Sequence, residues 1–289
     1  MELSGIGVWS SQLRYGDPSE AAEAAAELEE LGFTALWIPD VGGPVFDAVG
    51  RLLSATTATV IATGILNLWM HPASEVAESY AALTAAHGER FLLGIGVSHA
   101  PLIDAREPGR YRKPLAATAS FLDALDAAPQ PVPVEHRVLA ALGPKMLELA
   151  ARRARGAHPY LVTPEHTAMA RAVLGDGPLL LPEQSVILTD RADEARAIGT
   201  AWLRGYLTLP NYANNLLRSG FSADDLQQVS DRLLDAIIAW GDEEAVLRRI
   251  AEHQAAGADH VCVQVLTADQ TVFPREQWRR IGAACTGKP

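Results

Sequence analysis

One histidine, His99, stands where it could move a proton during a reaction. It follows the apolar run of residues 91–97, which contains Gly94 and Gly96 and is typical of a buried strand. Glycines at a strand end let a ligand approach the backbone closely, and an imidazole of pKa about 6.5 gives or takes a proton at neutral pH. We predict that His99 is catalytic and that Gly96 and Ser98 contact a cofactor. The alternative is a structural histidine.

Two further segments could hold an anion at the start of a helix. Gly143 and Pro144 precede a helical pattern, and proline suits the first helical position because an N–H there would have no partner. The free N–H groups and the dipole at a helix start attract phosphate. Thr163 stands at the equivalent point of the following unit. We predict that these residues and Leu142 bind a cofactor phosphate, and plain helix capping is the alternative.

The elements that must position these residues alternate between strand-like and helix-like patterns. Such alternation implies parallel strands joined by right-handed crossovers, and eight units match the size of a (β/α)8 TIM barrel, whose site lies at the carboxyl ends of its strands. We expect one domain, residues 1–289, with insertions at about 100–133 and 206–240 on that face. The eight predicted strands are residues 3–9, 34–39, 59–66, 91–97, 137–142, 157–162, 184–189 and 260–266.

Composition narrows the class of protein. The chain has 289 residues, of which 48% are hydrophobic, so it can bury a large core. Its net charge of −11 argues against a nucleic-acid or anionic membrane surface, and it contains no apolar run long enough to span a membrane and no signal-peptide pattern. The two cysteines, Cys262 and Cys285, do not indicate a disulfide framework and fit a reducing cytoplasm. No metal-ligand spacing, dinucleotide-binding fingerprint or nucleophile elbow is found.

Several short motifs together resemble the bacterial luciferase-like superfamily, and within it the branch that uses the deazaflavin coenzyme F420. Each motif alone is weak, but they occur in the expected order over nearly the whole chain. They are LWIPD at residues 36–40, TGILN at 63–67, HP at 71–72, GERFLLGIG at 88–96, ALGP at 141–144 and PYLVTPEH at 159–166.

The resemblance assigns roles to residues after the second and third strands. It implies a non-proline cis peptide bond between Gly64 and Ile65, forming a bulge behind the deazaflavin ring, and it places Asp40 against the ring's edge. Asn67, after the third strand, is expected to reach the same pocket. In several deazaflavin dehydrogenases a catalytic histidine follows the acidic residue, whereas here Val41 follows it. A turn or helix-cap carboxylate is the alternative for Asp40.

The resemblance therefore implies a coenzyme F420-dependent oxidoreductase that transfers a hydride between C5 of the deazaflavin and a small organic substrate. His99 would exchange the proton, Asp40 would orient the ring, and a homodimer is a family expectation. Two alternatives stay open, an FMN-dependent monooxygenase of the same fold and a non-catalytic deazaflavin-binding protein. A basic cluster at Arg106, Arg110, Arg112 and Lys113 could hold the acidic cofactor tail or simply face water.

Overall fold

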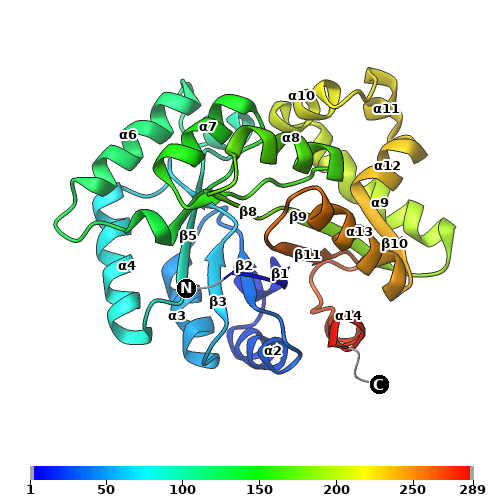
Figure 1. Cartoon of the computed structure of the whole chain (residues 1–289), viewed down its shortest axis with the longest axis horizontal. Helices are drawn as coiled ribbons and strands as arrows, with labels where there is room; N and C mark the ends of the chain where they lie inside the picture. Colours follow the sequence, from blue (N-terminus) through cyan, green and yellow to red (C-terminus); the bar gives the residue numbers. More distant parts are fainter. Residues whose placement is uncertain (1–2, 287–289) are drawn as a thin grey trace.

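The computed structural model describes residues 3–286, so residues 1–2 and 287–289 of the expected domain lie outside the described part. Strands and helices alternate along the chain, as predicted (Figure 1). The strands are β1 (Ile6–Trp9), β2 (Ala35–Ile38), β3 (Val60–Thr63), β4 (Leu66–Asn67), β5 (Phe91–Gly96), β6 (Arg137–Leu139), β7 (Gly156–Ala157), β8 (Leu179–Leu180), β9 (Glu183–Leu188), β10 (Ile238–Gly241) and β11 (Val261–Val265).

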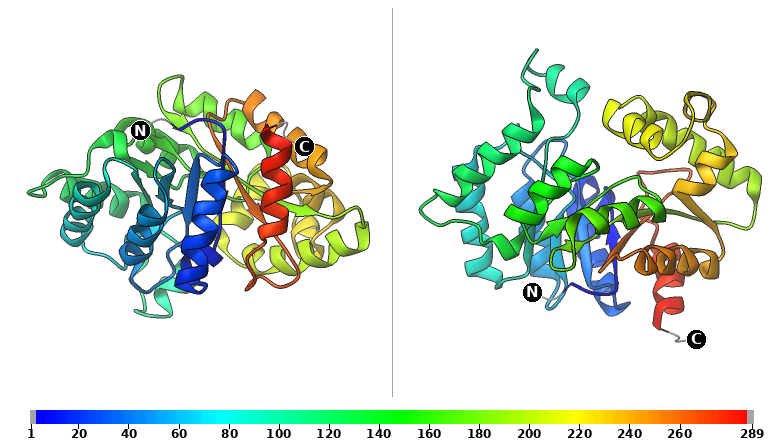
Figure 2. Two further views of the ribbon diagram at one scale, coloured as in Figure 1. Left: turned by 90° about the horizontal axis from the view of Figure 1, so that it is seen from below. Right: turned by 45° about the horizontal axis from the view of Figure 1, so that its top comes forward.

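Helices connect the strands and lie outside the sheet (Figures 1 and 2). They are α1 (Gln12–Tyr15), α2 (Pro18–Glu30), α3 (Val45–Ala55), α4 (Ala73–His87), α5 (Ala100–Asp104), α6 (Pro114–Asp126), the 3-10 turn η1 (Val134–His136), α7 (Pro144–Arg153), α8 (Pro164–Leu174), α9 (Ala192–Leu207), α10 (Pro210–Arg218), α11 (Ala223–Gln228), α12 (Asp231–Ile237), α13 (Glu243–Ala255) and α14 (Arg275–Thr286).

The sheet is parallel throughout its described pairs and is curled into a half-barrel. Its strands follow the order β10-β9-β11-β1-β2-β3-β5-β6-β7-β8, and β4 pairs with β5. Parallel pairing places the carboxyl ends of all these strands at one edge. The predicted α/β architecture is therefore confirmed, and the residues that follow the strands are brought together.

Local signals in the sequence explain where the helices begin and end. Asp17 caps α2 by accepting hydrogen bonds from the N–H groups of Ser19 and Glu20, and Pro18 occupies its first turn. Gly32 then takes a φ of 90°, which ends that helix at little cost because glycine has no Cβ.

The interior of the curled sheet is filled rather than hollow. Trp37 is completely buried there and stacks on His158 with 4.3 Å between ring centroids. Small neighbours such as Ala35, Ala62 and Cys262 pack against this indole. The filled interior forms a firm floor beneath the edge where the strands end.

Several predicted segments differ from the structure. The strands expected at 137–142 and 157–162 end at Leu139 and Ala157, because residues that follow them line the groove at the strand ends. The strand expected at 59–66 is interrupted after Thr63, where a cis peptide bond joins Gly64 and Ile65, as the resemblance implied. The last residues of the insertion expected at 206–240 form strand β10, which pairs with β9. Helix α12 runs into this strand with no glycine or proline between them, so the sequence carries no local signal of the change.

Helix α10, in the second insertion, contacts the loop that follows β5. The side-chain amide of Asn211 on α10 donates to the backbone oxygen of Ser98, 3.1 Å away, and Figure 2 shows this part of the chain at one end of the sheet. Within residues 3–286, no helix has the length and apolar character needed to cross a lipid bilayer.

Candidate functional site

Two adjoining cavities, of about 390 Å³ and 320 Å³, lie where the strands end. We call the larger one the aromatic cavity, whose own walls include Trp9, Leu102, Tyr206 and Leu209. We call the smaller one the polar cavity, whose own walls include Tyr111, Gly143, Asn214 and Arg218. The two share Ile65, Ser98, His99, Ala140, His158, Tyr160 and Tyr212. They therefore form one groove with a chemically different lining at each end.

The bulge at Gly64–Ile65 forms part of the floor of the groove. The indole N–H of Trp9 donates to the Gly64 oxygen at 2.9 Å. A Cβ on Gly64 would lie 2.7 Å from Trp9 Nε1 and 3.1 Å from His158 Nε2, so only glycine fits between these side chains. A Cβ on Gly96 would lie 2.7 Å from Ile65 Cγ1, and the absence of one lets the Ile65 side chain pack there.

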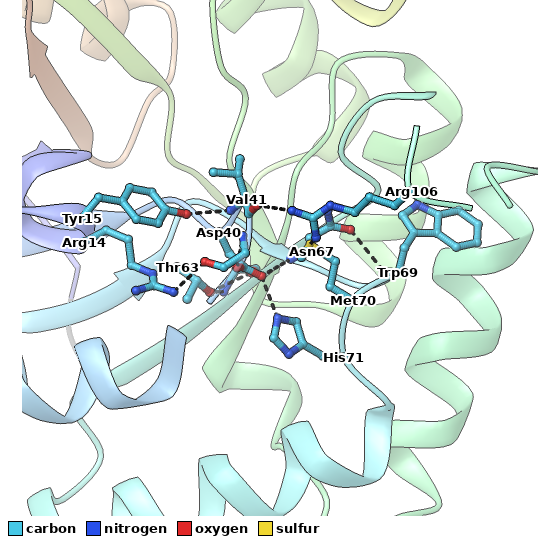
Figure 3. Close-up of polar contacts among 12 residues, drawn as sticks. Arg14, Tyr15, Asp40, Val41, Thr63, Asn67, Trp69, Met70, His71 and Arg106 are labelled. Atoms are coloured by element: carbon cyan, nitrogen blue, oxygen red, sulfur yellow. Dashed lines mark hydrogen bonds and ion pairs between the residues drawn. The ribbon is translucent and has the colours of Figure 1, made fainter. Parts of the chain in front are cut away.

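Asp40 holds the loops after β2 and β3 together (Figure 3). Its Oδ2 accepts hydrogen bonds from the N–H of Asn67 at 3.1 Å and from Nε2 of His71 at 2.8 Å, while Oδ1 accepts from the N–H of Gly42 at 3.1 Å. The carboxylate is completely buried. Both oxygens of Asp40 are therefore engaged by protein donors. One of these donors is His71, which the sequence analysis quoted only as a motif residue.

Part of the basic cluster fastens the rim of the groove. Arg106 donates to the backbone oxygen of Val41 at 2.9 Å, and Arg110 donates to that of Trp69 at 3.0 Å. The N–H of Val41 donates to the hydroxyl of Tyr15 at 2.8 Å. Figure 3 shows Arg106 and Tyr15 on either side of Val41, the residue that follows Asp40. Two of the four predicted basic residues thus serve loop structure.

His99 reaches into the groove between its two ends. The ring lies 4.9 Å from that of Tyr212, centroid to centroid, and its Nδ1 is buried without a hydrogen-bond partner among the described residues. Burial lowers the pKa of His99 to about 4 because the imidazolium would lose its hydration. The ring is therefore neutral at pH 7 and has a nitrogen free to accept a proton.

His158 presents a second free nitrogen at the floor. Its Nδ1 lies 2.7 Å from the carbonyl oxygen of Leu181, which can only accept, so Nδ1 carries the proton. Nε2 then has a lone pair, and no group in the described chain donates to it. Burial lowers the pKa of this histidine to about 4, which keeps that lone pair free at neutral pH. His158 is thus a fixed hydrogen-bond acceptor.

Three tyrosines, Tyr160, Tyr206 and Tyr212, line the aromatic cavity. Tyr160 donates to Oε1 of Gln264 at 2.7 Å, and its hydroxyl lies 3.0 Å from that of Tyr206. Burial raises the pKa of Tyr206 to about 12 and that of Tyr160 well above its usual value, so both keep their protons. Tyr212 packs against the other two, with centroids 5.9 and 5.5 Å away.

The two predicted anion sites differ in how the helix start is satisfied. Gly143 precedes α7, has no side chain capping the helix and lies in the wall of the polar cavity. A Cβ built on it would be 3.9 Å from a terminal nitrogen of Arg218. Thr163 instead caps α8, since its hydroxyl accepts from the N–H of His166 at 3.3 Å, and it lines neither cavity. An anion can therefore reach the start of α7 from the groove.

The structure brings most of the predicted residues to one groove. Asp40, Gly64, Ile65, Ser98, His99, Leu142 and Gly143 line it. Asn67, Gly96, Pro144 and Thr163 lie outside the lining, as supporting residues of the same loops.

The sequence analysis missed His158 as an acceptor, the roles of Tyr160, Tyr206 and Tyr212, and Arg218. His158 and Tyr160 lie within the strand predicted at 157–162, whereas the observed strand β7 ends at Ala157, so no local signal in the sequence places these two side chains in the groove. The described residues contain no group of three or more His, Cys, Asp or Glu side chains that could hold a metal ion.

Comparisons with known proteins identify the same architecture. The sequence profile of the family described as luciferase-like monooxygenase matches residues 3–260. A protein of Mycobacterium tuberculosis named as a putative coenzyme F420-dependent oxidoreductase is 24% identical over an alignment that covers 92% of this chain and 95% of the relative.

Two solved structures share the fold at low sequence identity. The coenzyme F420-dependent tetrahydromethanopterin reductase of Methanopyrus kandleri has a TM-score of 0.72 at 17% identity and covers 98% of each chain. A type II Baeyer-Villiger monooxygenase from Pseudomonas putida, the oxygenating constituent of 3,6-diketocamphane monooxygenase in complex with FMN, has a TM-score of 0.71 at 14% identity and covers 96% of each chain.

Proposed function

The chain belongs to the luciferase-like monooxygenase family, and from that premise we propose that it is a coenzyme F420-dependent oxidoreductase acting on a small organic substrate. The names of the mycobacterial relative and of the Methanopyrus enzyme support F420 as the cofactor. One structural observation carries the proposal. A helix start open to an anion adjoins a cavity that is lined mainly by apolar and aromatic side chains and holds a neutral histidine.

The polar cavity suits the phosphate of the cofactor. Backbone N–H groups at the start of α7 and the guanidinium of Arg218 face the same space beside Gly143, and together they offer the donors and positive charge that a phosphate requires. Leu142 and Pro144 fix the path of this loop. Thr163 supports this loop indirectly. It caps α8, and Nε2 of His166 on that helix lies 2.9 Å from the backbone oxygen of Leu142.

The floor of the groove suits a flat ring that carries an N–H. Ile65 offers an apolar surface, and the free lone pair of His158 lies beside Gly64. An unpartnered buried acceptor is costly unless a ligand or water supplies a donor, and both deazaflavin and flavin rings carry an N–H on their pyrimidine edge. Asn67, Gly96 and Asp40 would act from beneath by fixing the bulge.

When bound, the deazaflavin supplies a carbon that takes or gives a hydride. His99 exchanges the accompanying proton, because its ring is neutral at pH 7 and its buried Nδ1 has no partner within the described chain. The surrounding aromatic side chains exclude water from this exchange. Asp40, with its oxygens engaged by Gly42, Asn67 and His71, contributes by positioning rather than by proton transfer.

We also infer that the curled sheet closes into a (β/α)8 barrel. Strands β8 and β9 are separated only by residues 181 and 182, and the N–H of Leu181 donates to the oxygen of Ala157 on one side while that of Cys262 donates to the oxygen of Pro182 on the other. Strand β11 in turn pairs with β1. If β3 with β4 and β8 with β9 are each counted as one bent strand, the barrel has eight strands and β10 lies outside it.

Calorimetric titration of the purified protein with F420 and with FMN tests this function, followed by turnover assays with the cofactor that binds. We expect saturable binding of F420, weaker binding of FMN, and reduction or oxidation of the deazaflavin by members of an alcohol, enone and imine panel. Tighter binding of FMN would favour the monooxygenase alternative, for which the FMN complex of the Pseudomonas relative is the supporting observation. F420 binding without any turnover would favour a non-catalytic carrier.

A further inference from the structure

The aromatic cavity contains no cationic side chain that could pair with an anionic substrate. None of the described residues in its lining is a lysine or arginine. Its one acidic residue, Asp40, is completely buried and accepts hydrogen bonds from protein donors. The two histidines that reach it are neutral at pH 7, because burial lowers the pKa of each to about 4. Moving an unpaired ion into such a space is strongly unfavourable.

The walls around this space are apolar and broad. Trp9 and Tyr160 lie 5.4 Å apart, centroid to centroid, and Leu102 and Leu209 come from the two insertions. Flat aromatic faces and branched aliphatic side chains favour a substrate with an apolar body about the size of a ring.

The hydrogen bonds among the tyrosines determine whether the hydroxyl of Tyr206 can donate a hydrogen bond to a ligand or only accept one. Tyr160 has one proton, and it donates that proton to Gln264. The contact of 3.0 Å between Tyr160 and Tyr206 must then use the proton of Tyr206. The Tyr206 oxygen keeps a free lone pair and no proton to give. A ligand that contacts this oxygen must therefore be a donor.

We propose that the substrate is an uncharged molecule with an apolar, ring-sized body and a hydroxyl group that donates to the Tyr206 oxygen. This proposal rests on the proposed function, and it narrows the substrate to a class. It excludes phosphorylated and carboxylated substrates from the aromatic cavity, and it makes Tyr206 a specificity-determining residue contributed by α9.

Three probes of equal body size test the proposal, namely cyclohexanol, methoxycyclohexane and cyclohexyl phosphate. Their dissociation constants are measured by ligand-observed NMR titration of the full chain, with and without F420. We expect cyclohexanol to bind at least fivefold more tightly than methoxycyclohexane, which lacks the donor, and cyclohexyl phosphate not to bind this cavity when F420 is present.

Tyr206→Phe separates the hydroxyl of Tyr206 from its ring. It keeps the aromatic face, and we expect it to lower the affinity for cyclohexanol about fivefold, the effect of one hydrogen bond, with no change for methoxycyclohexane. Tyr80→Phe is the matched control, because it removes a hydroxyl that contacts His136 and lines neither cavity, and it should leave the affinity for cyclohexanol unchanged.

The outcomes of the two proposals are distinct. If F420 binds but cyclohexyl phosphate binds as well as cyclohexanol, or Tyr206→Phe has no effect, the substrate class is wrong while the proposed function stands. If F420 does not bind and the probes still discriminate as expected, the cavity recognises uncharged hydroxyl compounds and the proposed function is wrong.

Discussion

The two ends of the groove use their polar atoms in opposite ways. In the polar cavity, the start of α7 is uncapped and lies beside an arginine, so charge and N–H donors face the space. In the aromatic cavity, the one carboxylate is engaged by the protein, and the free polar atoms are acceptors. They belong to Tyr206 and to His158, which both cavities share. The comparison indicates that one groove can bind an anion at its polar end and select an uncharged, ring-sized substrate at its aromatic end.

The residues at the junction of the two ends carry the largest expected effect. Replacing His99 by alanine should lower kcat about 100- to 1,000-fold, the usual contribution of a general acid or base. The affinity for F420, measured by its fluorescence on titration, should change less than about threefold, because the proposed cofactor contacts are made by other residues. A variant that keeps wild-type kcat would show that proton exchange happens elsewhere.

Acid should destabilise the folded protein through the buried side chain of His158. The pKa of His158 is about 4 in the folded protein and about 6.5 when unfolded, so the unfolded chain binds a proton first as the pH falls. The stabilisation from neutral His158 is present above pH 6.5 and is lost as the pH falls towards 4. Between pH 7 and 5 this loss is about 2 kcal/mol of the free energy of unfolding.

Urea unfolding of the wild type and of His158→Phe at both pH values measures this loss. The variant keeps an aromatic ring on Trp37 but cannot titrate, so its free energy of unfolding should fall by about 2 kcal/mol less over the same interval. An equal fall in both proteins would contradict the assignment of a depressed pKa to His158.

The polar end should respond to loss of its cation. Arg218→Ala is expected to weaken F420 binding about tenfold, because one charge-assisted contact to a phosphate is removed, and to reduce the salt dependence of the binding constant. Arg204→Ala removes an exposed arginine of α9 that lines neither cavity and serves as the control. Equal losses in the two variants would assign the effect to general charge.

The acceptor that both cavities share, Nε2 of His158, should contribute less to cofactor affinity. His158→Phe is expected to weaken F420 binding about fivefold, since a neutral hydrogen bond contributes on the order of 1 kcal/mol. In the wild type, imidazole NMR signals of His158 should shift when F420 binds, because Nε2 gains a donor. Binding without any shift of those signals would place the ring away from this histidine.

The sequence predicted the loop residues after strands well and those of the insertions poorly. His99, Ser98, Asp40 and Gly143 are recognisable because a strand end in a parallel sheet determines where the next residue lies. Tyr206 and Arg218 reach the groove only through the path of the segment at 206–240, which tertiary packing decides.

Even a well-placed residue can hide its role in the sequence. The residues at 140–142 and 158–162 have the apolar character of strands, yet β6 ends at Leu139 and β7 at Ala157. Ala140, Leu142, His158 and Tyr160 instead line the groove. The acceptor role of His158 depends on the distant carbonyl of Leu181, and the direction of the tyrosine hydrogen bonds depends on Gln264. Neither partner is adjacent in the sequence, so only the structure could identify these roles.

A crystal structure of the protein with oxidised F420 tests most directly whether the two ends hold one cofactor between them. We predict that the phosphate lies between the start of α7 and Arg218, and that a ring N–H faces Nε2 of His158 beside the Gly64–Ile65 bulge. A cofactor bound with its phosphate elsewhere, or a groove that stays empty in crystals saturated with F420, would contradict this account.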